Sequence, residues 1–170
     1  MTGHTTHSQP VYPPLAWDAS GRHHLVWMAE PDAALLAALG TCPGELEVID
    51  NDDPAMTRLQ AELAGGHMGL RLYLAGDEDT LWRASRLAAA AGLGEAEIRR
   101  HRVGTLARPV WCVHCGHTQR SVHTNLSNCA GCGRTLFVRD HFSRRLGAYM
   151  GFQIDAEVPG VCPPLEALYP

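Results

Sequence analysis

Short apolar runs and longer amphipathic stretches follow one another along the N-terminal part of the chain. Four apolar runs have the length and composition of β-strands, at residues 23–29, 46–50, 70–75 and 98–103. Three stretches between them have the spacing of helices, at residues 31–39, 54–64 and 80–91. Strands that alternate with helices of about ten residues imply βαβ crossovers. The pattern therefore predicts an α/β fold in which a small parallel sheet is flanked by helices.

Residues that start and stop helices support these boundaries. Pro31 suits a first helical position, and Gly40 suits the end of that helix. Asp52 or Asp53 is expected to cap the second helix, while residues 77–79 lead into the third.

The two ends of the chain have no usable hydrophobic period. Residues 1–22 are polar and rich in prolines, so we predict a flexible tail. Residues 23–105 form the predicted α/β domain, and residues 106–154 a cysteine module with the segment that follows it. Residues 155–170 are expected to form an extended C-terminal tail.

Composition narrows the classes of protein that this chain can belong to. Hydrophobic residues make up 45% and charged residues 19% of 170 residues, which is an ordinary globular composition. The net charge of -4 argues against a protein that binds nucleic acid through its phosphates. No apolar run is long enough to cross a membrane, and the N-terminus does not resemble a secretion signal. We therefore expect a cytoplasmic protein, whose six cysteines are metal ligands or free thiols rather than disulfides.

Four of these cysteines occur in two Cys-x-x-Cys hooks, each followed directly by glycine. The hooks are Cys112-Val-His-Cys115-Gly116 and Cys129-Ala-Gly-Cys132-Gly133. Two intervening residues allow both thiolates of a tight turn to reach one ion, and glycine permits the left-handed backbone that completes the turn. Four thiolates form a closed tetrahedral shell around zinc, without an open position for catalysis. We predict one structural Zn²⁺ held by Cys112, Cys115, Cys129 and Cys132.

Other interpretations of the hooks remain open at this stage. A rubredoxin-like iron uses similar hooks, and a histidine (His114, His117 or His123) can replace one thiolate. Two disulfides and a nucleic-acid-binding ribbon are further alternatives. Cys42 and Cys162 lie far from the hooks and are expected to be ordinary thiols.

A segment rich in arginine and aromatic residues follows the second hook. This combination is typical of the core of a protein–protein interface. The candidate interface residues are Arg139, Phe142, Arg144, Arg145, Tyr149 and Phe152. The aromatic residues are expected to be exposed; the alternative is that residues 146–154 pack on the α/β domain. No set of residues suggests a catalytic or cofactor-binding site.

The α/β part resembles the NAD(P)-binding module of the ferredoxin-reductase family. Residues 70–93 match its last strand, turn and helix, and the resemblance implies a nucleotide-binding fold over residues 23–104. The family's glycine-rich turn, which binds pyrophosphate, corresponds to residues 29–32, where Glu30 and Asp32 would repel a phosphate. Ala75 stands at the position of the family's cysteine beside the nicotinamide. We therefore predict a nucleotide site that has decayed.

The C-terminal half carries a closer resemblance, to the small accessory subunit of dimethylamine monooxygenase. The matching residues are the two hooks, Val138–Gly151 and Asp155–Gly160. This resemblance implies an accessory subunit of a multicomponent enzyme that uses NAD(P)H and oxygen to convert dimethylamine to methylamine and formaldehyde. The implied partners are a haem-bearing oxygenase subunit and a reductase subunit with FMN and an iron–sulfur cluster. The alternative is an electron carrier with an iron site, or an NAD(P)-binding oxidoreductase component.

Overall fold

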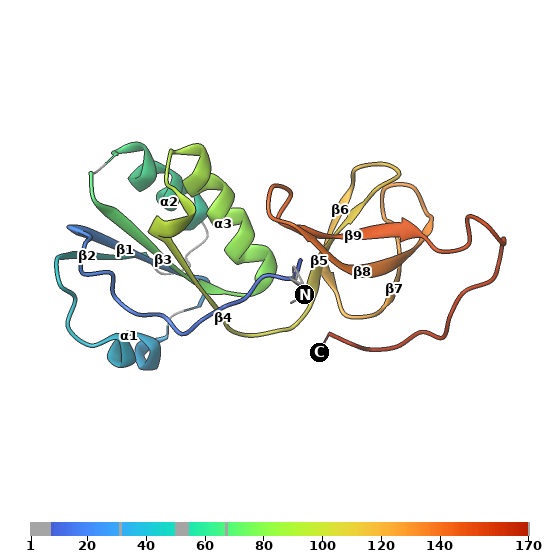
Figure 1. Cartoon of the computed structure of the whole chain (residues 1–170), viewed down its shortest axis with the longest axis horizontal. Helices are drawn as coiled ribbons and strands as arrows, with labels where there is room; N and C mark the ends of the chain where they lie inside the picture. Colours follow the sequence, from blue (N-terminus) through green and yellow to red (C-terminus); the bar gives the residue numbers. More distant parts are fainter. Residues whose placement is uncertain (1–7, 31, 50–54, 67, 170) are drawn as a thin grey trace, which may run out of the picture. The chain divides into compact units, whose positions relative to one another are not determined.

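The computed structural model describes residues 8–30, 32–49, 55–66 and 68–169 (Figure 1). The chain divides into two compact units. The α/β unit is Tyr12–Gly104, and the β unit contains the residues from Thr105 onward together with the described residues before Tyr12. In the described part of the chain, no helix has the length and apolar character needed to cross a membrane.

The α/β unit contains a parallel sheet of four strands in the order β2-β1-β3-β4. The strands are β1 (His23–Met28), β2 (Glu45–Ile49), β3 (Leu70–Gly76) and β4 (Ile98–Arg102). The helices are α1 (Ala33–Leu39), α2 (Ala55–Ala64) and α3 (Glu78–Ala90), and a short 3-10 turn, η1 (Glu95–Glu97), precedes β4. The predicted parallel sheet with alternating helices is therefore confirmed.

Carboxylate caps determine where the helices begin. Asp32 accepts a hydrogen bond from the amide of Leu35 at 2.9 Å, and Asp77 accepts one from Thr80 at 2.8 Å. Gly40 ends α1 with a φ of +68°, which glycine adopts without strain. The predicted cap of α2, Asp52 or Asp53, lies outside the described residues.

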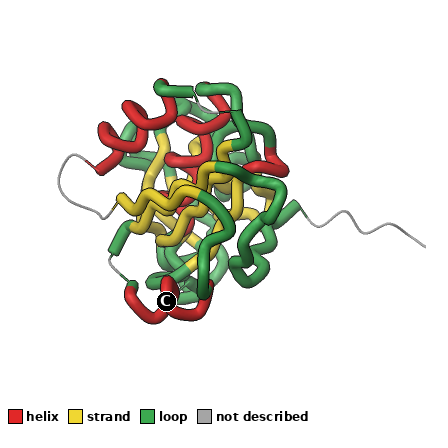
Figure 2. The backbone as a smooth tube through the Cα atoms, turned by 90° about the vertical axis from the view of Figure 1, so that its left-hand side faces the viewer, coloured by secondary structure: helices red, strands yellow, loops and turns green. Residues whose placement is uncertain are grey.

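Helices cover both faces of this sheet, α2 and α3 on one face and α1 on the other (Figures 1 and 2). Beneath α2 and α3, the core contains buried leucines of α2, β3 and α3, among them Leu59, Leu72 and Leu81. On the other face, α1 and Trp17 pack over a smaller cluster that includes Tyr73. Both faces of the central strands β1 and β3 are thus shielded from water.

The N-terminal segment differs from the predicted flexible tail. Residues 12–22 belong to the α/β unit, and Trp17 packs against Tyr73 with ring centroids 4.8 Å apart. The Arg71 guanidinium donates to Asp18 at 2.8 Å. The prediction of a flexible tail is therefore wrong for residues 12–22, because the sheet face beside α1 needs more apolar cover than a seven-residue helix provides. Residues 1–7 lie outside the described residues.

The β unit contains a five-stranded sheet in the order β6-β5-β9-β8-β7. Its strands are β5 (Arg108–Cys112), β6 (Thr118–Val122), β7 (Leu126–Asn128), β8 (Thr135–Ser143) and β9 (Ala148–Gln153). Neighbouring strands are antiparallel except for β5 and β9, which are parallel. The sheet curls on itself, and the two cysteine hooks lie in turns between its strands (Figure 1).

Candidate metal centre

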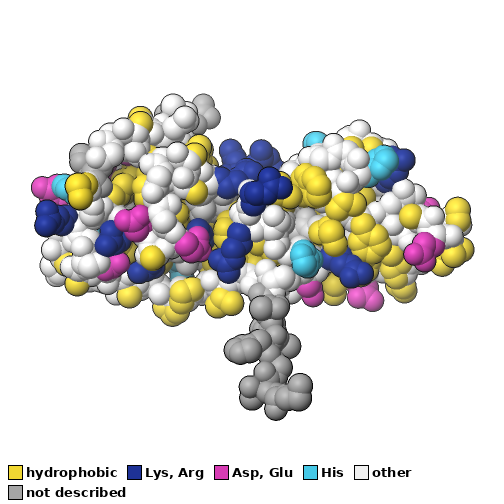
Figure 3. Space-filling model, turned by 45° about the horizontal axis from the view of Figure 1, so that its top comes forward, with side chains coloured by type: hydrophobic (Ala, Val, Ile, Leu, Met, Phe, Trp, Pro, Cys, Tyr) yellow, Lys and Arg dark blue, Asp and Glu magenta, His cyan; other side chains and the backbone are white. Residues whose placement is uncertain are grey.

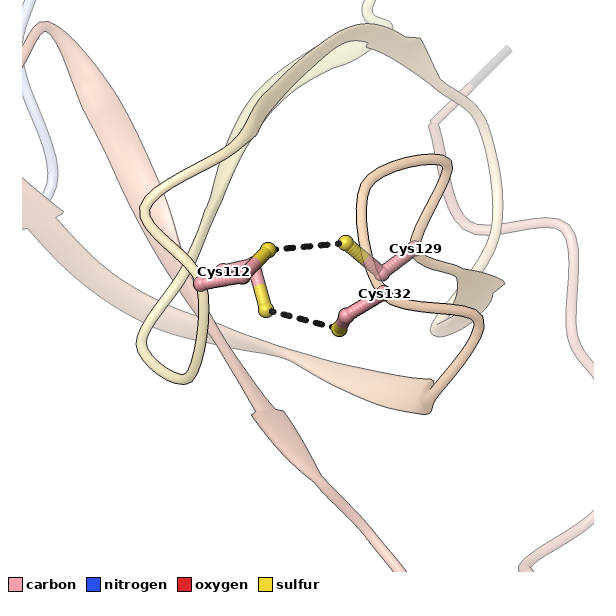
Figure 4. Close-up of side chains that lie close together, drawn as sticks. Cys112, Cys129 and Cys132 are labelled. Atoms are coloured by element: carbon pink, nitrogen blue, oxygen red, sulfur yellow. Dashed lines mark hydrogen bonds between the residues drawn. The ribbon is translucent and has the colours of Figure 1, made fainter.

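Each hook lies in a turn that joins two strands of the β unit. Cys112 is the last residue of β5, so the first hook joins β5 to β6. Cys129 follows β7 directly, so the second hook joins β7 to β8. Figure 4 shows cysteine side chains from the two turns pointing toward one another.

The two hooks have the same hydrogen-bonding pattern. In the first, the amide of Gly116 donates to the carbonyl of Cys112 at 2.9 Å, and in the second Gly133 donates to Cys129 at 2.7 Å. The amide of Cys112 donates to the carbonyl of His117, as that of Cys129 does to the carbonyl of Arg134. Gly116 and Gly133 have φ values of +76° and +74°, the left-handed conformation expected from the sequence. The site is thus built from one local structure used twice.

The four sulfur atoms have the spacing of a tetrahedral metal site. Cys112 Sγ lies 3.8 Å from Cys132 Sγ, and Cys115 Sγ lies 3.6 Å from Cys129 Sγ. All four sulfurs lie within 4.8 Å of one another. Sulfurs bound at about 2.3 Å in a tetrahedron are about 3.8 Å apart, whereas a disulfide needs about 2.05 Å. The spacing matches a metal tetrathiolate and does not match the alternative of two disulfides.

Backbone amides favour the charged form of some of these thiols. The amide of Arg134 donates to Cys132 and is the main reason that the pKa of this thiol falls to about 6. The amide of His117 acts in the same direction at Cys115, but local desolvation of this exposed thiol and its three neighbouring thiols outweigh it and raise the pKa to about 12. Four adjacent thiols cannot all lose their protons unless a cation balances the charge. The donor set therefore fits a soft or borderline divalent ion.

Residues around the hooks hold them together, and several were not singled out from the sequence. A Cβ atom on Gly131 would lie 2.8 Å from the Cβ atom of His117, so only glycine lets the second hook approach the first this closely. Gln119 on β6 accepts a hydrogen bond from the amide of Ala130 at 3.1 Å and donates to Ser127 at 2.6 Å. Leu136 is fully buried against Cys112 and Cys129. The sequence signals for these residues were weak, because glycine and glutamine occur in many turns.

The histidines near the hooks are not part of the cluster. Among the described residues, the metal-ligating group consists of the four cysteines, and His114, His117 and His123 do not belong to it. His123 instead contacts the backbone of Tyr169, its Nδ1 lying 2.8 Å from that carbonyl oxygen. Cys42 and Cys162 are free thiols outside the cluster.

The structure divides the candidate interface residues into two groups. Phe142 and Tyr149 are buried against each other, with ring centroids 4.9 Å apart, so the expectation that they are exposed is wrong. Arg108 contributes to the burial of Tyr149, because its guanidinium lies 4.1 Å from the centroid of that ring and 3.9 Å from that of Tyr169, and it pairs with Asp140 at 2.7 Å. These contacts could not be predicted from local sequence patterns, since the residues that make them are far apart along the chain.

The other candidate interface residues lie at the surface. Arg144 and Arg145 are exposed in the turn between β8 and β9. Arg139 on β8 is also exposed, and its guanidinium lies 5.1 Å from the ring of Phe152, which is half-buried. Hydrophobic and basic side chains occur side by side on the surface of the β unit (Figure 3).

The carboxyl ends of β1 and β3 are where a sheet of this order binds a nucleotide. A Cβ atom on Gly76, the last residue of β3, would lie 2.9 Å from the Cβ atom of Ala29, so the two strand ends are in close contact. The N-terminus of α3 is capped by Asp77. Beside that cap, Tyr12 donates to buried Glu78 at 2.5 Å. Carboxylates of the chain thus lie at the N-terminus of α3, next to the end of β3.

Fold and site together define a protein with an α/β unit followed by a β unit that carries four clustered cysteines able to hold a metal ion. Comparison with known families gives a more specific assignment. Residues 28–98 match the N-terminal domain, and residues 109–152 the C-terminal domain, of the dimethylamine monooxygenase subunit DmmA-like family. The chain carries both domains of this family, one after the other, and belongs to it.

A curated relative supports this assignment. The chain is 42% identical over 112 residues to the heme-dependent oxidative N-demethylase delta subunit of Ectopseudomonas mendocina (strain ymp). The match covers 64% of this chain and 64% of the relative's length. No solved structure matches the chain significantly.

Proposed function

We propose that this chain is an accessory subunit of a multicomponent oxidative N-demethylase that uses NAD(P)H and oxygen to convert dimethylamine to methylamine and formaldehyde. Family membership and the related delta subunit support this proposal. In the proposed complex the chain scaffolds a haem-bearing oxygenase subunit and a reductase subunit with FMN and an iron–sulfur cluster. The complex is expected to work in the cytoplasm.

The observation that carries the scaffold role is the closed set of four cysteine ligands. Four protein sulfurs complete a tetrahedron, so a zinc ion there has no open position for water or substrate. When bound, zinc supplies the cross-link that holds the two hooks in place. We therefore propose a structural zinc ribbon.

The α/β unit is proposed to be a nucleotide-binding fold of the ferredoxin-reductase type that no longer binds nucleotide. Contact between Gly76 and Ala29, and the acidic caps of α1 and α3, support this view because a phosphate would meet carboxylates instead of free amides. The unit is then available as a rigid surface for assembly.

Exposed arginines of the β8–β9 hairpin are proposed to contact a partner subunit. Charge reversal by Arg144→Glu should weaken association with the partners, because a cation at a polar rim steers the encounter. The melting temperature of the chain alone should stay nearly constant, since Arg144 is exposed. Arg120→Glu, at another exposed position of the β unit, is the matched control.

Co-expression of the full chain with the oxygenase and reductase subunits tests the proposal as a whole. We expect a stable complex, one zinc per copy of this chain, and oxidation of NAD(P)H that depends on dimethylamine. A chain that purifies alone, with a complex of the other subunits that is fully active without it, would contradict the proposed function.

A second candidate is an electron carrier with a rubredoxin-like iron. The symmetric hooks, with amides of His117 and Arg134 directed at cysteine sulfurs, are the observation in its favour, because such hydrogen bonds also stabilise an iron tetrathiolate. Metal analysis and the visible spectrum separate the candidates. Colourless protein with zinc supports the scaffold, whereas a reversible iron–thiolate absorption band supports the carrier.

A further inference from the structure

Hydrogen bonds hold the backbone of the C-terminal segment after β9 on the β unit, while the side chains of the segment are exposed. Residues 156–168 are all exposed, although hydrogen bonds fix several of their backbone groups. Buried Asn125 donates to the carbonyl of Pro164 at 2.9 Å and accepts from the amide of Glu166 at 2.8 Å. The carbonyl of His123 accepts from the amides of Leu168 and Tyr169. The segment is therefore ordered before any partner binds.

The last described residue of this segment is its strongest anchor. Tyr169 is buried, and its hydroxyl accepts a hydrogen bond from Arg108 at 3.0 Å. The same guanidinium lies 3.9 Å from the centroid of the Tyr169 ring. Figure 1 shows the segment leaving β9 and returning along the β unit to the C-terminus.

Four large apolar side chains of the segment are exposed in two pairs. Val158 and Val161 flank a Pro-Gly turn in which the amide of Val161 donates to the carbonyl of Val158, and Gly160 has a φ of +80°. Asp155 holds this turn by accepting from the amide of Gly160. Leu165 and Leu168 form the second pair, beside the Asn125 contacts. Their exposed fractions are 58% and 63% for the valines, and 68% and 49% for the leucines.

The charges of the segment indicate the chemistry of its partner. Asp155, Glu157 and Glu166 are its ionisable acids, and residues 155–169 contain no arginine, lysine or histidine. Apolar side chains on a pre-ordered backbone lower the entropy cost of binding, and carboxylates beside them favour a cationic rim. The binding mode resembles that of extended peptides, whose side chains fill pockets of a groove.

We propose that residues 155–169 are a docking segment, whose valine and leucine pairs insert into an apolar groove with a basic rim on another subunit of the N-demethylase. This inference rests on the proposed function and adds the partner's chemistry to it. The docking segment is distinct from Arg139, Arg144 and Arg145, which are cationic and require an acidic surface.

The test co-expresses the other subunits with three forms of the full chain: the natural chain, a double variant and a control variant. Val161→Asp combined with Leu165→Asp should weaken assembly about tenfold or more, because it places two charges in an apolar groove. Zinc content and melting temperature should not change, since both side chains are exposed. Met68→Asp, at another exposed apolar position in the α/β unit, is the control and should assemble normally.

A further double variant tests the charge of the groove. Glu157→Arg combined with Glu166→Arg should also weaken assembly, and added salt should reduce the difference from the natural chain. A photo-crosslinking residue at Leu165 should form a product with the oxygenase or reductase subunit.

The possible outcomes separate the two proposals. If the natural chain does not assemble with these subunits, the proposed function and the docking segment both fail. If the natural chain assembles and the Val161/Leu165 variant assembles equally well, the docking segment alone is wrong. A cross-link from Leu165 to a second copy of this chain, without one to the other subunits, would likewise overturn it.

Discussion

The α/β unit and the β unit differ in the interactions that stabilise each of them. The α/β unit has apolar clusters on both faces of its sheet, formed by side chains of four strands and the helices over them. The metal region of the β unit has a cluster of only Cys112, Cys129 and Leu136, with Cys132 at its edge. Hydrophobic burial therefore surrounds the sheet of the first unit, whereas we expect a bound metal to connect the two hooks of the second.

This difference explains why the hooks are surrounded by polar contacts. In the curled sheet of the β unit, β7 has three residues, and two of the turns contain cysteines in place of apolar side chains. Small domains with limited cores commonly use a metal or a disulfide to add stability. A metal bound only by the folded state supplies that stability through its binding free energy.

The largest expected effect is the loss of one ligand. Cys132→Ser should unfold the hooks and their neighbouring strands, because binding of structural zinc contributes on the order of 10 kcal/mol in isolated zinc modules. Hydrogen exchange followed by mass spectrometry should show lost protection in β7 and β8 but normal protection in β1 and β3. Cys162→Ser, a free thiol outside the cluster, is the control. Equal loss of protection in both units would show that the α/β unit depends on the metal.

A substitution in the core of the α/β unit is expected to destabilise that unit and to leave the metal site intact. Leu72→Ala removes a fully buried side chain from β3 and should lower the free energy of unfolding by about 2–5 kcal/mol. The urea midpoint of this unit should fall while zinc content stays at one per chain. Release of zinc at the same, lowered midpoint would mean that the two units unfold as one.

A smaller effect is expected from crowding the two hooks. Gly131→Ala places a methyl group 2.8 Å from the Cβ atom of His117 and 3.1 Å from Cys115 Sγ. We expect zinc affinity to fall about tenfold, as for other residues that support metal ligands, measured by competition with a chelator. The neighbouring, exposed Ala130→Ser should bind zinc normally. Unchanged affinity of the Gly131 variant would show that the hooks can separate without cost.

The smallest effect concerns the N-terminal segment of the α/β unit. The hydrogen bond from Ser20, followed by that from Arg71, holds the pKa of Asp18 well below its usual value. A depressed folded-state pKa stabilises the protein above the unfolded value of about 3.9, and this contribution is lost as the pH falls below it. Asp18→Asn should thus lower the melting temperature slightly at pH 7, with a difference that shrinks toward pH 3. A difference that does not depend on pH would exclude this ionic contribution.

Much of the α/β unit could be predicted from the sequence. Its strands and helices follow local periodicity, and Asp77 and the stop at Gly40 act within one turn of the helix that they define. The start of α1 was predicted two residues too early, because Asp32 caps the helix and Ala33 is its first residue. The packing of residues 12–22 could not be predicted, because Trp17 and Asp18 contact residues of β1 and β3 through tertiary contacts without a periodic pattern. Irregular backbone carries no signal of what it will cover.

The candidate site divides in the same way. The spacing within each hook determined by itself which cysteines can share a metal, because two residues between ligands and a glycine after them are local requirements of the turn. Only the tertiary structure decided that Phe142 and Tyr149 are buried, that Arg108 holds Tyr169, and that Gly131 must be small. Those features depend on strands brought together from distant parts of the chain, and packing between such strands is not encoded in any short stretch of sequence.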